Sequence, residues 1–302
     1  MLIQLLVIYL ILPAAFIYSL WKASFQSKVE WLVQLLTTAM LIIWLVLSGP
    51  WDWFGYYVRY LWLVLLMIAV WKSLKKARSL PFQRALVRRR KWSVAIYALL
   101  LIVFGLYNSF VLSSYFVEGE ALELSFPLQE GTYYVAQGGN HVQMNYHQDY
   151  ESQKYALDIV KLNGLGMRAN GFYPQDLEKY AVYGVSLYSP CHGEVVETRD
   201  GLADLIPPEM DGTHPEGNYV ALRCDHAEPV IYLAHMQQNS LVVEEGMTVR
   251  EGDILGRVGN SGNTTEPHLH IHAEQNGKGI PLRFNGRFLV RNSLVRSCDQ
   301  CG

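Results

Sequence analysis

The sequence predicts an α-helical membrane region of about four transmembrane helices, followed by a mostly β domain built on an antiparallel sheet. Residues 1–117 contain long apolar runs and carry 12 Lys and Arg against 2 Asp and Glu, whereas residues 118–302 carry 13 against 25. Beyond Phe126 the apolar runs become short and are separated by glycine, proline and asparagine, a pattern typical of strands and turns. We therefore place the domain boundary between residues 117 and 118.

Four apolar runs in the first region are long enough to span a membrane, which takes roughly 20 residues. They cover residues 2–20, 31–48, 53–71 and 92–117. The third run contains Arg59 near one end, where a long side chain can reach the membrane interface among neighbouring tryptophans and tyrosines. The first run lacks both a basic leader and a small-residue cleavage site, so we expect it to be retained as a span.

The distribution of basic residues predicts the orientation of these spans. Nine lysines and arginines crowd residues 72–91, and such loops face the cytoplasm. Counting spans outward from this loop places residues 118–302 on the extracytoplasmic side of the cytoplasmic membrane. The basic loop is explained by topology and by contact with membrane lipid. The outer domain is acidic and shows no basic groove, which argues against nucleic-acid binding.

All four cysteines lie in the region assigned to the outside, where thiols are commonly oxidised. Cys191 and Cys224 flank two strand-like segments that can lie side by side, so we expect a disulfide between them. Cys298 and Cys301 form a terminal CxxC motif that fits a second disulfide, a redox pair or half of a metal site.

The run Pro267-His268-Leu269-His270-Ile271-His272 is the strongest indication of chemistry. Alternate residues of a strand point to one face, so this run would align three imidazoles. Neutral imidazole is the commonest protein ligand for zinc, and a catalytic zinc site has three protein ligands and one open position. The preceding residues 256–266 are rich in turn formers and would deliver the strand into a cleft. The sequence therefore predicts a metal site here.

Three separated motifs resemble the LytM and lysostaphin type of zinc metallopeptidases, family M23, which cut peptide cross-links in bacterial peptidoglycan. They are Gln153-Lys154-Tyr155-Ala156-Leu157-Asp158, Tyr232-Leu233-Ala234-His235, and the stretch from Gly259 to His270 that contains the histidine run. The resemblance covers about residues 133–283, which we take as the core of the outer domain. It implies a bacterial hydrolase that depends on Zn²⁺.

The resemblance also implies roles for individual residues. Asp158 and His270 correspond to zinc ligands, and His235 and His268 correspond to the catalytic histidines. The remaining ligand should be a histidine a few positions before Asp158, but the nearest candidate, His147, lies eleven residues upstream. We choose His147 and keep His141 as the reserve.

The other histidines receive weaker interpretations. His272 would share the strand face of His270, but residues two apart along a strand are separated by roughly 7 Å, so both can hardly bind one ion. We interpret His272 as part of the cleft wall or as a support for the site. His192, His214 and His226 lie in turn-like contexts and are expected at the surface.

These features favour a membrane-anchored zinc endopeptidase acting on peptidoglycan cross-links or stem peptides. Two alternatives stay open: a non-catalytic module of the same fold that activates other wall enzymes, and a peptidase of a protein substrate. Four spans exceed what a tether needs, so a membrane protein partner or a sensing role is a further hypothesis. A lipoyl or biotinyl carrier is excluded because residues 182–257 contain no lysine to modify.

Overall fold

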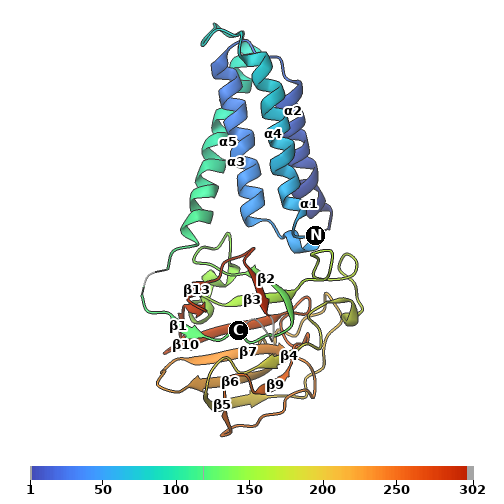
Figure 1. Cartoon of the computed structure of the whole chain (residues 1–302), viewed down its shortest axis with the longest axis vertical. Coiled ribbons are helices and arrows are strands. Elements are labelled where there is room, and N and C mark those ends of the chain that lie inside the picture. Colours follow the sequence, from blue (N-terminus) through green and yellow to red (C-terminus); the bar gives the residue numbers. More distant parts are fainter. Residues whose placement is uncertain (1, 118, 298–302) are drawn as a thin grey trace. The chain divides into compact units, whose positions relative to one another are not determined.

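The computed structural model describes residues 2–117 and 119–297 and divides the chain into two compact units (Figure 1). The helical unit consists of residues 1–51 and 57–112, and the β unit consists of residues 52–56 and 113–302. The short segment 52–56 therefore packs with the β unit, although it lies between two helices in the sequence.

The helical unit contains one long helix for each apolar run. The first is built from α1 (Leu2–Leu6), a π-helical turn (Val7–Ile11) and α2 (Leu12–Lys22), and it is followed by α3 (Lys28–Ser48), α4 (Val58–Ala77) and α5 (Arg88–Ser113). Among the described residues, three helical stretches are long and apolar enough to cross a membrane: Leu2–Lys22, Lys28–Ser48 and Arg88–Ser113.

The third predicted run differs from its expected position. Residues 51–53 form a single 3₁₀ turn, and the helix begins only at Val58 and continues to Ala77. It therefore takes in Lys72, Lys75 and Lys76, whose charges are costly in hydrocarbon. That α4 crosses the membrane stays a prediction.

The helical unit buries several polar side chains among apolar ones, and it also exposes large apolar side chains on its outside. Gln34 donates from Nε2 to Ser19 Oγ at 2.9 Å, and Asn108 donates from Nδ2 to the Met40 carbonyl at 2.9 Å. Large apolar side chains are exposed along the same helices, with Met67 and Ile102 each 62% exposed. Such a surface is stable when lipid surrounds it and unfavourable in water.

The β unit is built on one large, almost entirely antiparallel sheet. Its strands run in the order β14-β2-β3-β10-β7-β6-β5-β8, with β11 paired to β10, and two small sheets, β1-β12-β13 and β4-β9, complete the unit. The strands are β1 Leu122–Leu124, β2 Gly131–Gln137, β3 Leu157–Lys161, β4 Ser186–Tyr188, β5 Gly193–Arg199, β6 Asn218–Cys224, β7 Val230–Met236, β8 Thr248–Val249, β9 Ile254–Arg257, β10 Leu269–Gln275, β11 Lys278–Ile280, β12 Leu282–Phe284, β13 Arg287–Phe288 and β14 Leu294–Ser297.

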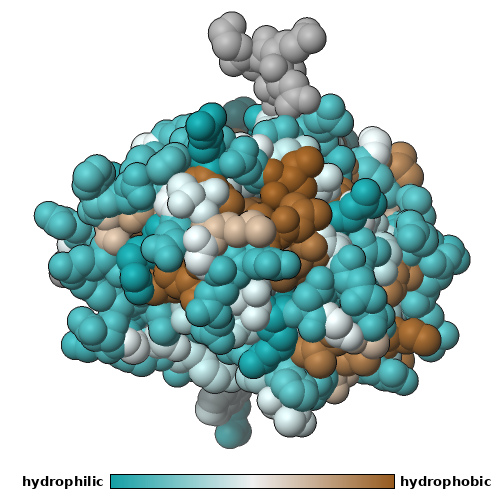
Figure 2. All heavy atoms as spheres, turned by 90° about the horizontal axis from the view of Figure 1, so that it is seen from below, coloured by the Kyte–Doolittle hydropathy of each residue, from teal (hydrophilic) through white to brown (hydrophobic). Residues whose placement is uncertain are grey.

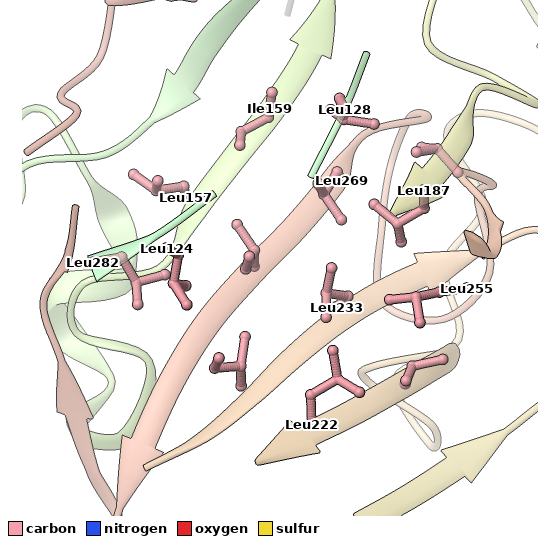
Figure 3. Close-up of a cluster of buried hydrophobic side chains, with 14 of the residues drawn as sticks. Leu124, Leu128, Leu157, Ile159, Leu187, Leu222, Leu233, Leu255, Leu269 and Leu282 are labelled. Atoms are coloured by element: carbon pink, nitrogen blue, oxygen red, sulfur yellow. The ribbon is translucent and has the colours of Figure 1, made fainter. Parts of the chain in front are cut away.

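The main hydrophobic core lies against one face of the large sheet (Figure 3). Alternate residues of the central strands point into it, including Ile159 of β3, Leu269 and Ile271 of β10, and Leu233 of β7. Because side chains alternate along a strand, the residues between them lie on the opposite face. This pattern leaves the histidine positions of β10 on the face away from the core.

The face of the protein in Figure 2 is mainly hydrophilic, and loops connect the strands of the β unit. Figure 2 shows a face on which hydrophilic side chains predominate and apolar ones form separated groups. The stretch 205–212 forms a loop, and residues 176–180 contain one 3₁₀ turn at Leu177–Lys179.

The predicted disulfide between Cys191 and Cys224 is present, with a Cα–Cα distance of 5.8 Å. It joins the start of β5 to the end of β6, whose antiparallel pairing places Gly193 opposite Cys224. Cys298 and Cys301 lie outside the described residues, so their state stays a prediction.

We expect removal of this disulfide to destabilise the β unit without preventing its folding. The bridge closes a loop with a sequence separation of 33, and a loop of that size contributes about 4 kcal/mol to the free energy of unfolding. Denaturant unfolding of the Cys191→Ala/Cys224→Ala chain should show this loss. The double variant removes both thiols of this bridge, and an unchanged midpoint would contradict the expectation.

Candidate metal centre

The register of three neighbouring strands places an aspartate beside a histidine on the face opposite the core. His270 of β10 pairs with Asp158 of β3 on one side and with Ala234 of β7 on the other. Directly opposed residues project to the same face with Cβ atoms about 5 Å apart. His270 Nδ1 accordingly lies 3.0 Å from Asp158 Oδ1, and both residues are buried.

His147 reaches the same carboxylate oxygen from a 3₁₀ turn, Tyr146–Asp149. Its Nε2 lies 3.0 Å from Asp158 Oδ1. Asn145 caps the turn, because its side chain accepts a hydrogen bond from the His147 backbone N–H while its amide donates to the Ala156 carbonyl. The eleven-residue spacing between His147 and Asp158 is therefore spanned by an ordered turn that brings the imidazole back to the sheet.

His235 reaches the site because the backbone of β7 is locally reversed. Leu233 points into the core and Ala234 to the site face, so strand alternation alone would turn His235 toward the core. Instead His235 has φ of 60°, a left-handed conformation that is uncommon for residues other than glycine, and the β6–β7 register shifts near its position. Backbone strain of this kind is characteristic of functional sites.

Two carbonyl groups fix the ring orientations of His235 and His268. His235 Nδ1 lies 2.9 Å from the Ser261 carbonyl, and His268 Nδ1 lies 2.8 Å from the Glu266 carbonyl. A carbonyl only accepts, so Nδ1 is the donor in both rings and Nε2 of each neutral ring is left basic. His268 Nε2 is buried, lies 3.5 Å from Asp158 Oδ1 and makes no hydrogen bond to any described residue.

The close approach of two loops holds Ser261 in place. Gly262 has φ of 89°, and a Cβ atom there would lie 2.4 Å from the backbone nitrogen of Gly217. Glycine is thus required by both conformation and space. Ser261 Oγ accepts from the Asn218 N–H and donates to the Met236 carbonyl, which ties the loop to β6 and β7.

The donor atoms converge closely enough to hold a metal ion. Two overlapping groups satisfy this within the described chain, His147–Asp158–His270 and His235–His268–His270, with ligand atoms within 4.8 Å of one another. The first group includes a carboxylate, and imidazole and carboxylate are the ligands of catalytic zinc sites. The residues therefore fit a divalent metal such as zinc.

The electrostatics of the site favour the protonation states that bind a metal. Burial lowers the pKa of His270 to about 4 and holds that of His235 well below its usual range, so both rings are neutral at pH 7. Burial alone would raise the pKa of Asp158, but His147 and His268 outweigh it and hold this pKa well below its usual range. The neutral imidazole of His270 and the ionised carboxylate of Asp158 are therefore both ready to bind a metal.

The remaining histidines fall into three environments. His272 is buried, its Nδ1 lies 3.0 Å from His270 Nε2, and its ring stacks on Tyr232. It therefore supports His270 on the side away from Asp158. His141 belongs to neither metal-binding group of the described residues. His192 and His226 are exposed, as expected, and His214 is partly exposed.

Tyr146 and Arg168 are site residues that the sequence analysis missed. The ring centroids of Tyr146 and His147 lie 4.1 Å apart. The negative charge of Asp158, together with burial, raises the pKa of the Tyr146 hydroxyl. Arg168 lines a cavity beside Asp158 and His268. The only signal in the sequence for Tyr146 is its position next to His147, and Arg168 has none.

Two cavities adjoin the site. One of about 350 Å³ includes Asp158 and His268 in its walls, and one of about 260 Å³ includes His147, His235 and His270. Tyr146 and Asn263 line both cavities. The polar donor atoms are therefore reachable from two sides.

Residues 178–281 match the model of peptidase family M23. The match includes His235, His268 and His270 but begins after His147 and Asp158, which the fold brings to them.

The chain is also similar to parts of several known proteins. The chain is 30% identical over 86 residues to an uncharacterised metalloprotease from Haemophilus influenzae, a stretch that covers 28% of this chain and only 17% of that protein. A zinc-containing peptidase from Vibrio cholerae is 17% identical, with a TM-score of 0.31 over 53% of this chain and 39% of its own. The catalytic domain of lysostaphin from Staphylococcus simulans is 23% identical, with a TM-score of 0.24 over 37% and 83%.

We expect the left-handed backbone at His235 to affect the free energy of unfolding of variants substituted at this position. Asparagine tolerates this conformation, whereas a β-branched side chain is strained in it by roughly 1–2 kcal/mol. His235→Val should therefore unfold more easily than His235→Asn by about that amount in denaturant titrations. Equal stability of the two variants would show that the backbone at this position is not constrained as described.

Proposed function

We propose that this chain, whose residues 178–281 match peptidase family M23, is a membrane-anchored zinc endopeptidase that cuts peptide bonds in peptidoglycan on the extracytoplasmic side of the bacterial cytoplasmic membrane. The observation that carries the proposal is the convergence of Asp158 with four histidines on one face of the sheet, beside two cavities.

His147, Asp158 and His270 are the proposed metal ligands. Two neutral imidazoles and one carboxylate would hold Zn²⁺ with a residual positive charge and leave a position open. Zinc bound there supplies Lewis-acid polarisation of the scissile carbonyl and an acidified water. His272 orients the His270 ring, because His272 Nδ1 lies within hydrogen-bond distance of His270 Nε2.

His235 and His268 are the proposed proton carriers. Their rings lie 4.8 Å apart, and the carbonyls of Ser261 and Glu266 leave Nε2 of both rings basic. One such nitrogen can accept the proton of the attacking water and return it to the amine that leaves. Once protonated, the pair can also stabilise negative charge on the carbonyl oxygen.

Location and access support a cell-wall substrate. The apolar helices would keep the β unit next to the membrane, and the two cavities sharing Tyr146 and Asn263 give an extended peptide room on both sides of the donor atoms. Membrane lipid would surround the helical unit, and a membrane protein partner would account for more spans than a tether needs.

We expect zinc content to separate the ligands from the proton carriers. In the full chain purified in detergent, His147→Ala, Asp158→Asn and His270→Ala should lose bound zinc, because each removes a donor from the same carboxylate-containing group. His235→Ala and His268→Ala should keep zinc. Inductively coupled plasma mass spectrometry measures this directly, with His192→Ala as a surface control; loss of zinc from His235→Ala but not from Asp158→Asn would point to the other group.

We expect the wild-type chain to release peptides with new amino termini from purified peptidoglycan, and the His268→Ala chain to release at least a hundredfold less, the scale of loss for a general acid–base group. Mass spectrometry of the released fragments identifies the bond. A chelator should abolish release, and added zinc should restore it.

A wild-type chain that binds zinc but leaves peptidoglycan intact would redirect the search to protein substrates. A chain that binds no zinc at all would favour the non-catalytic module.

A further inference from the structure

The segment Asp52–Tyr56, which joins α3 to α4 in the sequence, is part of the β unit. The Tyr56 N–H donates to the Gly166 carbonyl at 2.8 Å. The Trp53 ring stacks on that of Tyr173 with their centroids 5.2 Å apart. Hydrogen bonding and aromatic packing thus fix both ends of this segment in the β unit.

Arg168 is buried against this segment. Its backbone N–H donates to the Asp52 carbonyl at 2.9 Å, its Nε donates to the Asp52 carboxylate, and its guanidinium lies 4.7 Å from the Trp53 ring centroid. Asp52 is fully buried, and Arg168 is 5% exposed. A buried guanidinium is stable only with such partners, so Asp52 determines where Arg168 lies.

The other end of the same guanidinium points to the proposed catalytic residues. Arg168 Nη1 donates to the Glu266 carboxylate, and the Glu266 carbonyl accepts the hydrogen bond from His268 Nδ1 at 2.8 Å. Thr264 Oγ1 also donates to the Glu266 carbonyl at 2.8 Å. Continuous contacts therefore lead from Asp52 through Arg168 and Glu266 to His268.

We propose that Asp52 is a positioning residue for His268. It fixes Arg168, Arg168 fixes Glu266, and the Glu266 carbonyl holds His268 with Nδ1 protonated and Nε2 turned toward Asp158. The β unit is therefore complete only when residues between two helices of the membrane region contribute to it. The proposal rests on the proposed function, since it concerns the role of His268 in peptide hydrolysis.

The test uses the full chain in detergent and soluble muropeptides, with initial rates of amine release measured at several concentrations. Asp52→Asn keeps the shape of the side chain and removes its charge, so we expect kcat to fall on the order of tenfold through displacement of His268, with KM and zinc content unchanged. Asp225→Asn is the matched control, because it removes a surface contact with His192 and should leave kcat unchanged.

A second variant keeps the test informative if Asp52→Asn unfolds. Asp52→Asn/Arg168→Gln removes both members of the pair, so no guanidinium is left buried without Asp52 as its partner. We expect its kcat to be as low as that of Arg168→Gln alone, because Asp52 acts through Arg168 and the two effects are not additive.

Three results would overturn the inference, and they can be distinguished from one another. Wild-type kcat in the double variant, or loss of zinc together with activity in Asp52→Asn, would show that Asp52 does not act through His268. A wild-type chain with neither zinc nor cleavage would overturn the proposed function and the inference together.

Discussion

The pairing of β10 with β3 and β7 is the constraint on which the candidate site depends. One register places His270 opposite both Asp158 and Ala234, and a slip by a single residue would turn the histidines into the core and the aliphatic residues into the cleft. Burial of Leu269 and Ile271 on the other face of the same strand therefore holds the register that places His270 in the site. The alternation of histidine and aliphatic residues along β10 thus supplies both the core and the side chains of the candidate site.

Much of this arrangement is readable from the sequence because it follows from local periodicity. The alternation of histidine and aliphatic residues from 267 to 272 predicts a strand with one chemical face, and β10 has that form. The strands next to Cys191 and Cys224 can be predicted in the same way, and the predicted disulfide between the two cysteines is confirmed. Long apolar runs predict helices by composition alone, and each of the four runs overlaps one.

Other features depend on contacts between distant residues and have no local signal. His235 would face the core if β7 were regular, so only the left-handed backbone and the Ser261 carbonyl explain its place in the site. The β unit also includes residues 52–56, although the apolar pattern places residues 53–56 at the start of a membrane span. A short turn between two helices has no hydrophobic periodicity, so its sequence does not show whether it joins another unit or is exposed to solvent.

The buried cluster of Asp52, Arg168 and Glu266 cannot be explained by stability alone. Removing three charges from water costs several kcal/mol per ion, and apolar side chains of similar volume would often pack as stably. The guanidinium nevertheless adds direction, because its rigid fork joins two carboxylates at fixed angles and a tyrosine or leucine would not. Burial raises the pKa of Glu266 while Arg168 opposes that rise, so the arginine also favours the ionised carboxylate. A directional, charged connection ends on the carbonyl that orients His268, and the proposed role of His268 in proton transfer would require such precise placement.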